Sequence, residues 1–183
     1  MRTCCFLLAA VSLTAAAQPR RVLLDAHNCY PYDGKYADRV ERALATGTPV
    51  AIEQDLAWHV DPTTGKGRSV LSHEVKTTGG EPLMRDYFFE RIRPLVEGEL
   101  KSGNKSRWPL IVLNLDFKTN EEAHLKAVWH LIYEYRHWLT SAPKNGAKPE
   151  KLDVKPVLVL TGNNDAQELV FHNAVPAGGR LLV

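Results

Sequence analysis

The residues with the clearest capacity for chemistry are three acidic side chains on two predicted strands. Glu53 and Asp55 are separated by one residue in an apolar run, and alternate residues of a strand share a face, so both carboxylates should point the same way. Asp116 lies in a second such run, between Leu115 and Phe117. A buried, unpaired carboxylate is costly, and a divalent cation is the simplest compensation. Hard oxygen ligands favour Mg²⁺ or Ca²⁺ over zinc.

The second acidic run predicts a strand with two chemically different faces. Asn114, Asp116 and Lys118 share one face, which we expect at the interior of a sheet or barrel, and the apolar residues of the run face the covering helices. The carboxylates could therefore form a structural ion network with Lys118 or with arginines instead of binding a metal. Such networks are common, and the residue pattern alone leaves both alternatives open.

Two histidines are predicted to lie at strand ends, near the carboxylates. His27 follows the first predicted strand, residues 22–26, and His73 follows an extended piece at 69–72. An imidazole can move protons near neutral pH, so one histidine could deprotonate an attacking oxygen while the other protonates a leaving oxygen. The alternative is that each is a polar residue at the rim of the sheet. We expect His124, His130, His137 and His172 to be surface or packing residues.

Short apolar runs alternate with amphipathic ones, which is typical of an α/β protein with a parallel sheet. The predicted strands are 22–26, 50–57, 110–117 and 157–161, with the start of a fifth at 180–183. Helices are predicted over 36–46 and 82–100, with a bend or split at Pro94. Two more should begin at the capping boxes Thr119-x-x-Glu122 and Asp165-x-x-Glu168.

The composition is that of an ordinary globular domain, and the amino terminus adds an expectation of export. The chain has 183 residues, 44% hydrophobic, with a formal charge of +2, which does not indicate a nucleic-acid partner. Residues 1–17 have the pattern of a secretory signal peptide, and their apolar run is shorter than the roughly 20 residues of a spanning helix. The mature domain would be 18–183, in which Cys29 is the only cysteine and cannot form an internal disulfide.

Short motifs along the chain occur in an order shared with one superfamily of enzymes. They are His27-Asn28, Glu53-x-Asp55, His73, Asp116-Phe117-Lys118 and Leu160-Thr161-Gly162-Asn163. This set resembles the amino-terminal half of the phospholipase C-like and glycerophosphodiester phosphodiesterase superfamily of TIM-barrel enzymes. It is most similar to the subgroup named after altered inheritance of mitochondria protein 6, over about residues 22–163.

The resemblance implies a fold, a cofactor and a role for each matching residue. The chain would supply about four β/α units, the amino-terminal half of a barrel that usually takes roughly 250 residues. We therefore expect either a truncated barrel, which we favour, or a smaller open sheet. The cofactor would be Ca²⁺ or Mg²⁺, and the activity that of a phosphoric diester hydrolase acting on a glycerophosphodiester or a phospholipid-like substrate. The implied roles are acid and base for His27 and His73, phosphate contact for Lys118, and metal ligation for Asn28, Glu53, Asp55 and Asp116.

Other functions remain open at this point. A non-catalytic secreted binding domain could keep the fold without turnover, and Asp116 replaces the longer Glu of many relatives. A metal-dependent amidohydrolase would need a His-x-His pair on the first strand, and a serine hydrolase a Gly-x-Ser-x-Gly motif; the sequence has neither. We expect a secreted or periplasmic protein with a small-molecule or lipid phosphodiester as partner and no obligate protein partner; transient contact with a membrane surface is left open.

Overall fold

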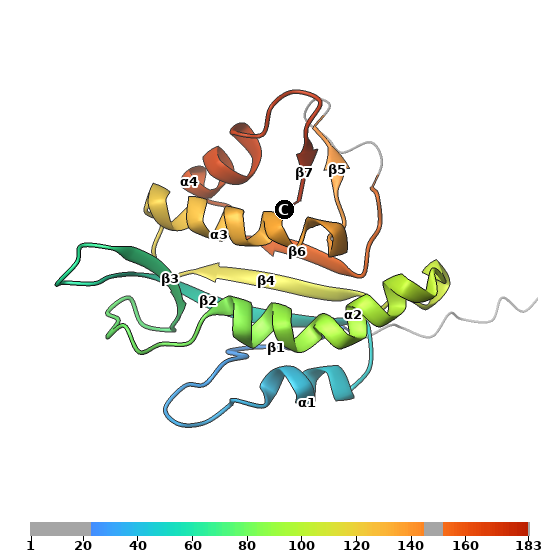
Figure 1. The fold of residues 1–183 in the computed structure, drawn as a ribbon, viewed down its shortest axis with the longest axis horizontal. Helices are drawn as coiled ribbons and strands as arrows, with labels where there is room; N and C mark the ends of the chain where they lie inside the picture. The colour runs from blue at the N-terminus through green and yellow to red at the C-terminus, as the bar shows by residue number, and fades with distance from the viewer. Residues whose placement is uncertain (1–22, 145–151, 183) are drawn as a thin grey trace, which may run out of the picture.

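The computed structural model describes residues 23–144 and 152–182, so the predicted signal peptide lies outside the described residues. Within them the fold is mixed α/β, built on a mostly parallel sheet. Its parallel strands are adjacent in the order in which they occur in the chain: β1 (Leu24–Ala26), β2 (Val50–Val60), β4 (Ile111–Phe117) and β6 (Val157–Thr161). The fifth strand, β3 (Gly67–Leu71), pairs antiparallel with the end of β2. Figure 1 shows this β2–β3 hairpin reaching beyond the other strands.

The helices connect these strands. They are α1 (Arg39–Ala45), α2 (Glu90–Ser102) preceded by a π-helical turn (Arg85–Phe89), α3 (Glu122–Glu134), and α4 (Asp165–Glu168) followed by a second π-helical turn (Leu169–Asn173). Single 3₁₀ turns occur at Lys105–Arg107 and Arg136–Trp138. No helix of the described residues is long and apolar enough to cross a membrane. The strand order and the connecting helices confirm the predicted α/β class with a mostly parallel sheet.

The hydrophobic core lies on one face of the sheet. Alternate residues of β2, such as Ile52 and Leu56, are fully buried there. Matching residues of β4 and β6 join the same core, together with the apolar stripes of the helices: Ile111, Leu113, Leu115, Phe117, Val157, Val159, Val40, Ile92, Val96, Leu125, Val128 and Ile132. Burial of these side chains is the main favourable term in holding helices against the sheet. This confirms the predicted apolar face; we call it the helix face, and the opposite one the site face.

Both predicted capping boxes are wrong. The third helix begins at Glu122 with Glu121 as its N-cap, and the Thr119 hydroxyl instead accepts a hydrogen bond from the backbone N–H of Trp58, at 2.9 Å. The fourth helix is capped by Asn164, whose side chain accepts from the N–H of Ala166. Thr119 is thus engaged in a tertiary contact, and Asn164, the residue before Asp165, supplies the cap of the fourth helix.

Two further expectations about elements differ from the structure. Pro94 does not split its helix, which runs unbroken from Glu90 to Ser102. A π-helical turn comes directly before that helix, and such widened turns are a known way of accommodating irregular bonding. Arg180–Leu181 does form a strand, β7, but it pairs antiparallel with β5 (Ala142–Pro143) and not with the main sheet. No fifth parallel strand is therefore present among the described residues.

Candidate metal centre

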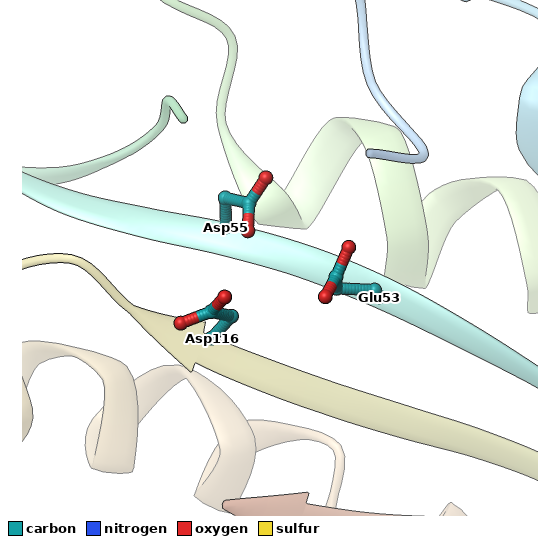
Figure 2. A group of neighbouring side chains, drawn as sticks. All are labelled: Glu53, Asp55 and Asp116. Atoms are coloured by element: carbon teal, nitrogen blue, oxygen red, sulfur yellow. The ribbon is translucent and has the colours of Figure 1, made fainter. Parts of the chain in front are cut away.

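Strand register brings the three predicted carboxylates together on the site face. In the parallel β2–β4 pair, Asp55 is opposite Asp116 and Glu53 is opposite Asn114. One oxygen from each carboxylate lies within 4.8 Å of the others. Figure 2 shows two of the side chains leaving β2 and the third leaving the end of β4 toward the same space. Glu53 and Asp55 are only 6% and 1% exposed, so two of the acids are truly buried.

Glu53 is held by the loop that follows β1. Its Oε2 accepts a hydrogen bond from the backbone N–H of Asn28, at 3.2 Å, and lies 2.8 Å from Nδ1 of His27. Burial raises the pKa of Glu53, and the hydrogen bond from Asn28 opposes that shift. Asn28 has a φ of 52°, in the left-handed region that Asn tolerates better than most residues. The structure thus places the backbone of Asn28 against Glu53, and gives no contact between the Asn28 side chain and the carboxylates.

The first predicted acid-base residue, His27, lies beside the cluster. Its Nδ1 faces Glu53, and its Nε2 lies 3.4 Å from Oδ2 of Asp25, a β1 residue on the site face. The guanidinium of Arg39 donates to the backbone carbonyl of His27, at 2.7 Å, which ties the loop to α1. His27 is therefore positioned between two carboxylates while its ring stays largely exposed.

The second, His73, is not brought into contact with the acids. Its ring is half-exposed, 6.0 Å from the ring of Tyr32, and its Nδ1 is 3.5 Å from Glu74. The preceding residue does reach the site, because the backbone N–H of Ser72 donates to the carbonyl of Asp55, at 3.1 Å. The backbone at this rim is thus fixed next to β2, while the imidazole points to a different set of neighbours.

Lys118 lies among the carboxylates. Its Nζ is 2.8 Å from Oδ2 of Asp116 and 3.1 Å from Oδ1 of Asp55. Burial lowers the pKa of Lys118, but hydrogen bonds to Asp116 and Asp55 outweigh burial and raise it. Lys118 therefore compensates two of the three acids, and Glu53 has only its histidine and a backbone N–H.

Tyr30 is a site residue that sequence reasoning missed. Its hydroxyl donates to Oδ2 of Asp55, and its ring is 1% exposed. Burial, followed by the bond to Asp55, raises the pKa of the Tyr30 phenol, so the hydroxyl remains a donor at neutral pH. The only signal available was its place three residues after His27, which does not reveal a partner 25 positions away.

The neighbouring Cys29 lacks the surroundings of an activated thiol. Its thiol is buried and lies 3.1 Å from the carbonyl of Ala26. Burial raises the pKa of Cys29 to about 12, so the thiolate is scarce at neutral pH. The residue packs the loop that carries His27 and Asn28.

The donor set fits a hard divalent cation. Three carboxylates from two adjacent strands offer oxygen ligands of the kind that Ca²⁺ and Mg²⁺ prefer. Two of them are buried, and one has a raised pKa, so a positive charge at this point would relieve the cost of their burial. Comparisons with protein-family models, curated proteins and solved structures gave no match for this chain.

Proposed function

We propose that this chain is a metal-dependent phosphodiesterase, with Ca²⁺ or Mg²⁺ held by Glu53, Asp55 and Asp116. The observation that carries the proposal is the convergence of three acids, two of them buried, on one point of the site face. The residue motifs that resemble the phospholipase C-like superfamily support the same reading. On this proposal the four sequentially ordered parallel strands are consecutive strands of a barrel, whose reaction centres lie at the carboxyl ends of strands.

The chain's own residues would divide the work as follows. A divalent ion would neutralise charge that develops on the phosphoryl oxygens. His27 would move a proton at Nε2, because its Nδ1 is directed at Glu53. Lys118 would turn from Asp116 toward the phosphate once a cation compensates the acids. His73 would be the second acid-base group, and this role requires its ring to leave Tyr32 and turn toward the cluster.

The expectations of export and of substrate belong to the same proposal. A secreted or periplasmic enzyme of this kind would act on a glycerophosphodiester or a phospholipid-like diester. Asn28 would be a further metal ligand through its side chain, in addition to its backbone bond to Glu53.

A non-catalytic binding domain is the second candidate, favoured by two contacts. Lys118 already compensates Asp55 and Asp116 without any metal. His73 makes its contacts away from the acids. If these contacts persist in solution, the carboxylates form a structural ion network and the domain has no turnover.

Hydrolysis of bis(4-nitrophenyl) phosphate separates the two candidates. We expect the protein to release 4-nitrophenol with added Ca²⁺ or Mg²⁺ and to stop when a chelator is added. Glu53→Gln removes one negative ligand but keeps an acceptor for the N–H of Asn28. It should lower kcat at least about 100-fold, which is the upper end of the loss seen when the groups that support metal ligands are changed. Glu122→Gln changes an exposed acid on α3 and is the matched control. Equal turnover in all three proteins would reject the metal centre.

A further inference from the structure

A second cavity lies at the far end of the β2–β3 hairpin, which reaches beyond the other strands in Figure 1. Its volume is about 480 Å³, and its lining includes His59, Asp61, Lys66, Arg68, Thr78 and Gly79. Among the described residues, the last of β4 to pair with β2 is Phe117, which lies opposite Leu56. His59 is four residues beyond Asp55 along β2, or about 13 Å at the rise of a β-strand. The cavity is therefore separate from the metal centre.

The register of the hairpin places three nitrogen-bearing side chains on one face. His59 lies opposite Arg68 in the antiparallel pair, and opposite residues share a face. Lys66 is two residues before Arg68, and its carbonyl accepts from the N–H of Asp61, at 2.9 Å, so the pairing extends to this position. Because alternate residues of a strand share a face, His59 points to the same side as Asp55. The site face thus continues into this cavity.

The two cations of the cavity are not compensated by a carboxylate. Within residues 23–144 and 152–182, neither Lys66 nor Arg68 forms an ion pair. Asp61 also lines the cavity, but its Oδ1 accepts hydrogen bonds from the backbone N–H groups of Thr63 and Thr64, at 2.8 and 2.9 Å. The cavity therefore has an excess of positive charge, because it holds two cations and one carboxylate that is already hydrogen-bonded.

The loop that follows β3 closes one side of the cavity. The guanidinium of Arg68 donates to the carbonyl of Gly79, and Oε2 of Glu81 accepts from the N–H of Gly79, at 2.7 Å. A Cβ built on Gly79 would lie 2.6 Å from Nε2 of His59, and the φ of Gly79 is 90°, so this close approach requires glycine. The loop holds Arg68 by one N–H, and the other N–H groups of the guanidinium have no bond to a described residue.

His59 is the buried donor of the cavity. It is only 9% exposed, and its Nδ1 lies 2.9 Å from the hydroxyl of Thr77, which fixes the orientation of the ring. Its Nε2 has no hydrogen-bond partner among the described residues, and it is not one of the unpartnered polar atoms that are shut off from solvent. Since His59 lines the cavity, Nε2 is the ring nitrogen that opens to it. The Thr77 hydroxyl can donate to Nδ1, which leaves the proton on Nε2 for a ligand.

We propose that this cavity binds a tetrahedral oxyanion, a sulfate or phosphate group, held by Lys66, Arg68 and Nε2 of His59. Two uncompensated cations and one N–H donor, from two strands, match an anion with several acceptor oxygens, because hydrogen bonds between charged groups are the strong ones. The group is either a free anion or the ester group of a larger ligand. The site uses none of the residues of the metal centre, so the proposal does not rest on the phosphodiesterase function.

Titration of the metal-free full chain with sodium sulfate tests the site without any turnover. Sulfate replaces chloride at constant ionic strength, so that general screening of charge does not change, and ¹H–¹⁵N NMR follows the backbone amides. We expect saturable shifts in residues 61–68. Arg68→Gln and Lys66→Gln should each weaken binding at least about tenfold, because each removes a charged donor. Lys76→Gln changes an exposed lysine of the next loop that does not line the cavity, and should bind as the wild type does.

Either of two results overturns the proposal. One is the absence of saturable shifts in the hairpin when sulfate replaces chloride. The other is a loss of affinity in Lys76→Gln as large as that in Arg68→Gln, because binding would then follow net charge and not this cavity.

Two substitutions of His59 test its role as a donor. His59→Leu removes Nε2 and should weaken sulfate binding several-fold, whereas His59→Gln can place an amide N–H near the same point and should retain most of the affinity. Circular dichroism checks that both variants fold. If His59→Leu does not fold, the exposed Arg68 and Lys66 variants still decide the proposal. Wild-type affinity in a folded His59→Leu protein would overturn the assignment of His59.

Two further variants separate this site from the metal centre. Glu53→Gln should bind sulfate as the wild type does, so a failure of the metal-centre proposal leaves this test intact. Lys118→Gln removes the cation that lies among the carboxylates and should also retain binding. If Lys118→Gln loses sulfate as fully as Arg68→Gln does, the anion binds at the metal centre and the proposal is overturned.

Phenyl sulfate distinguishes the two sources of the anion. If the cavity takes the ester group of a larger ligand, phenyl sulfate should bind at least as tightly as sulfate and should lose affinity in Arg68→Gln. If the cavity takes a free anion, phenyl sulfate should bind at least about tenfold more weakly than sulfate. Either result supports an oxyanion site. Binding of both sulfate and phenyl sulfate that is unchanged in Arg68→Gln would overturn it.

Discussion

The two faces of β2 and β4 are made from alternate residues of the same two strands, yet they solve opposite physical problems. On the helix face, Ile52 and Leu113 are fully buried among helices. On the site face, Glu53, Asp55 and Asp116 bring three acids together, with Lys118 as the cation that contacts two of them. A one-residue shift in either strand would exchange the two sets.

The difference shows which contacts hold the fold and which are available for function. The helix face gains stability from area removed from water. On the site face, burying charged groups costs folding free energy. A compensating cation offsets that cost, or the charges are kept for a role in chemistry. Substitutions on the two faces should therefore have different consequences, and four predictions follow from the largest effect to the smallest.

The sharpest contrast is between Ile52 and its neighbour Glu53. Ile52→Ala should lower the free energy of unfolding by about 2–5 kcal/mol, because it leaves a cavity in a packed core. Glu53→Gln should change it by less than about 1 kcal/mol in metal-free buffer, because the amide still accepts from Asn28. Urea denaturation followed by circular dichroism measures both. Similar losses for the two variants would remove the distinction between the faces.

Tyr30 tests whether the site face depends on its buried hydrogen bonds. Tyr30→Phe should cost about 1–3 kcal/mol, because Asp55 loses a donor while remaining buried. Tyr32→Phe is the matched control, since the Tyr32 hydroxyl has no hydrogen bond to a described residue. Thermal unfolding of both, at one pH and without metal, is the measurement. A Tyr30→Phe protein as stable as the control would mean that the bond contributes nothing.

His124 is the buried imidazole of the helix face and gives that face a pH dependence. It is fully buried, with Nε2 2.9 Å from the Ser69 hydroxyl and Nδ1 2.9 Å from that of Thr119. Burial lowers the pKa of His124, so the unfolded chain takes up its proton more readily than the folded one. Stability from the neutral ring is complete above about pH 6.5 and should be lost as pH falls through the lowered pKa, by at most about 1.4 kcal/mol per unit.

Unfolding free energies between pH 7.5 and 5 check this sign. His124→Gln cannot titrate and should show a shallower slope than the wild type. His130→Gln, an exposed histidine on the same helix, should keep the wild-type slope. Identical slopes in all three proteins would show that His124 does not control acid stability.

The smallest effect is expected at Leu160, an apolar residue of the site face. It pairs with Asn114 and is 45% exposed. Leu160→Ser should change the free energy of unfolding by no more than about 0.5 kcal/mol, whereas Val159→Ala, one residue away on the helix face, should cost more. A large loss at Leu160 would indicate that the site face also contributes a packed core.

The features of the fold that depend on a single strand or helix could be predicted from the sequence. The alternation in β2 and β4 predicted both faces correctly, and the stripe through Leu125, Val128 and Ile132 predicted the buried face of α3. The caps were not predictable in this way. The Thr119 hydroxyl is bonded to the N–H of Trp58, 61 residues earlier, so a local motif could not show that it was already engaged.

In the candidate site, too, local features could be predicted and contacts between distant segments could not. Strand periodicity and register sufficed to bring Glu53, Asp55 and Asp116 together. Lys118 and Tyr30 both contact Asp55, and the direction of those side chains depends on packing between segments far apart in the chain. His73 was expected at the cluster because it follows a strand, but its ring turns to Tyr32, a residue of a different loop.

The central claim is that the acids of the site face bind one divalent ion, and calorimetric titration tests it most directly. Metal-free protein at pH 7.5 is titrated with Ca²⁺ and, separately, with Mg²⁺, alongside Asp116→Asn, whose altered side chain is partly exposed and lies outside the core. We predict one ion per chain for at least one metal, and binding at least about tenfold weaker in Asp116→Asn. No saturable binding of either ion, or equal binding by the variant, would contradict the account.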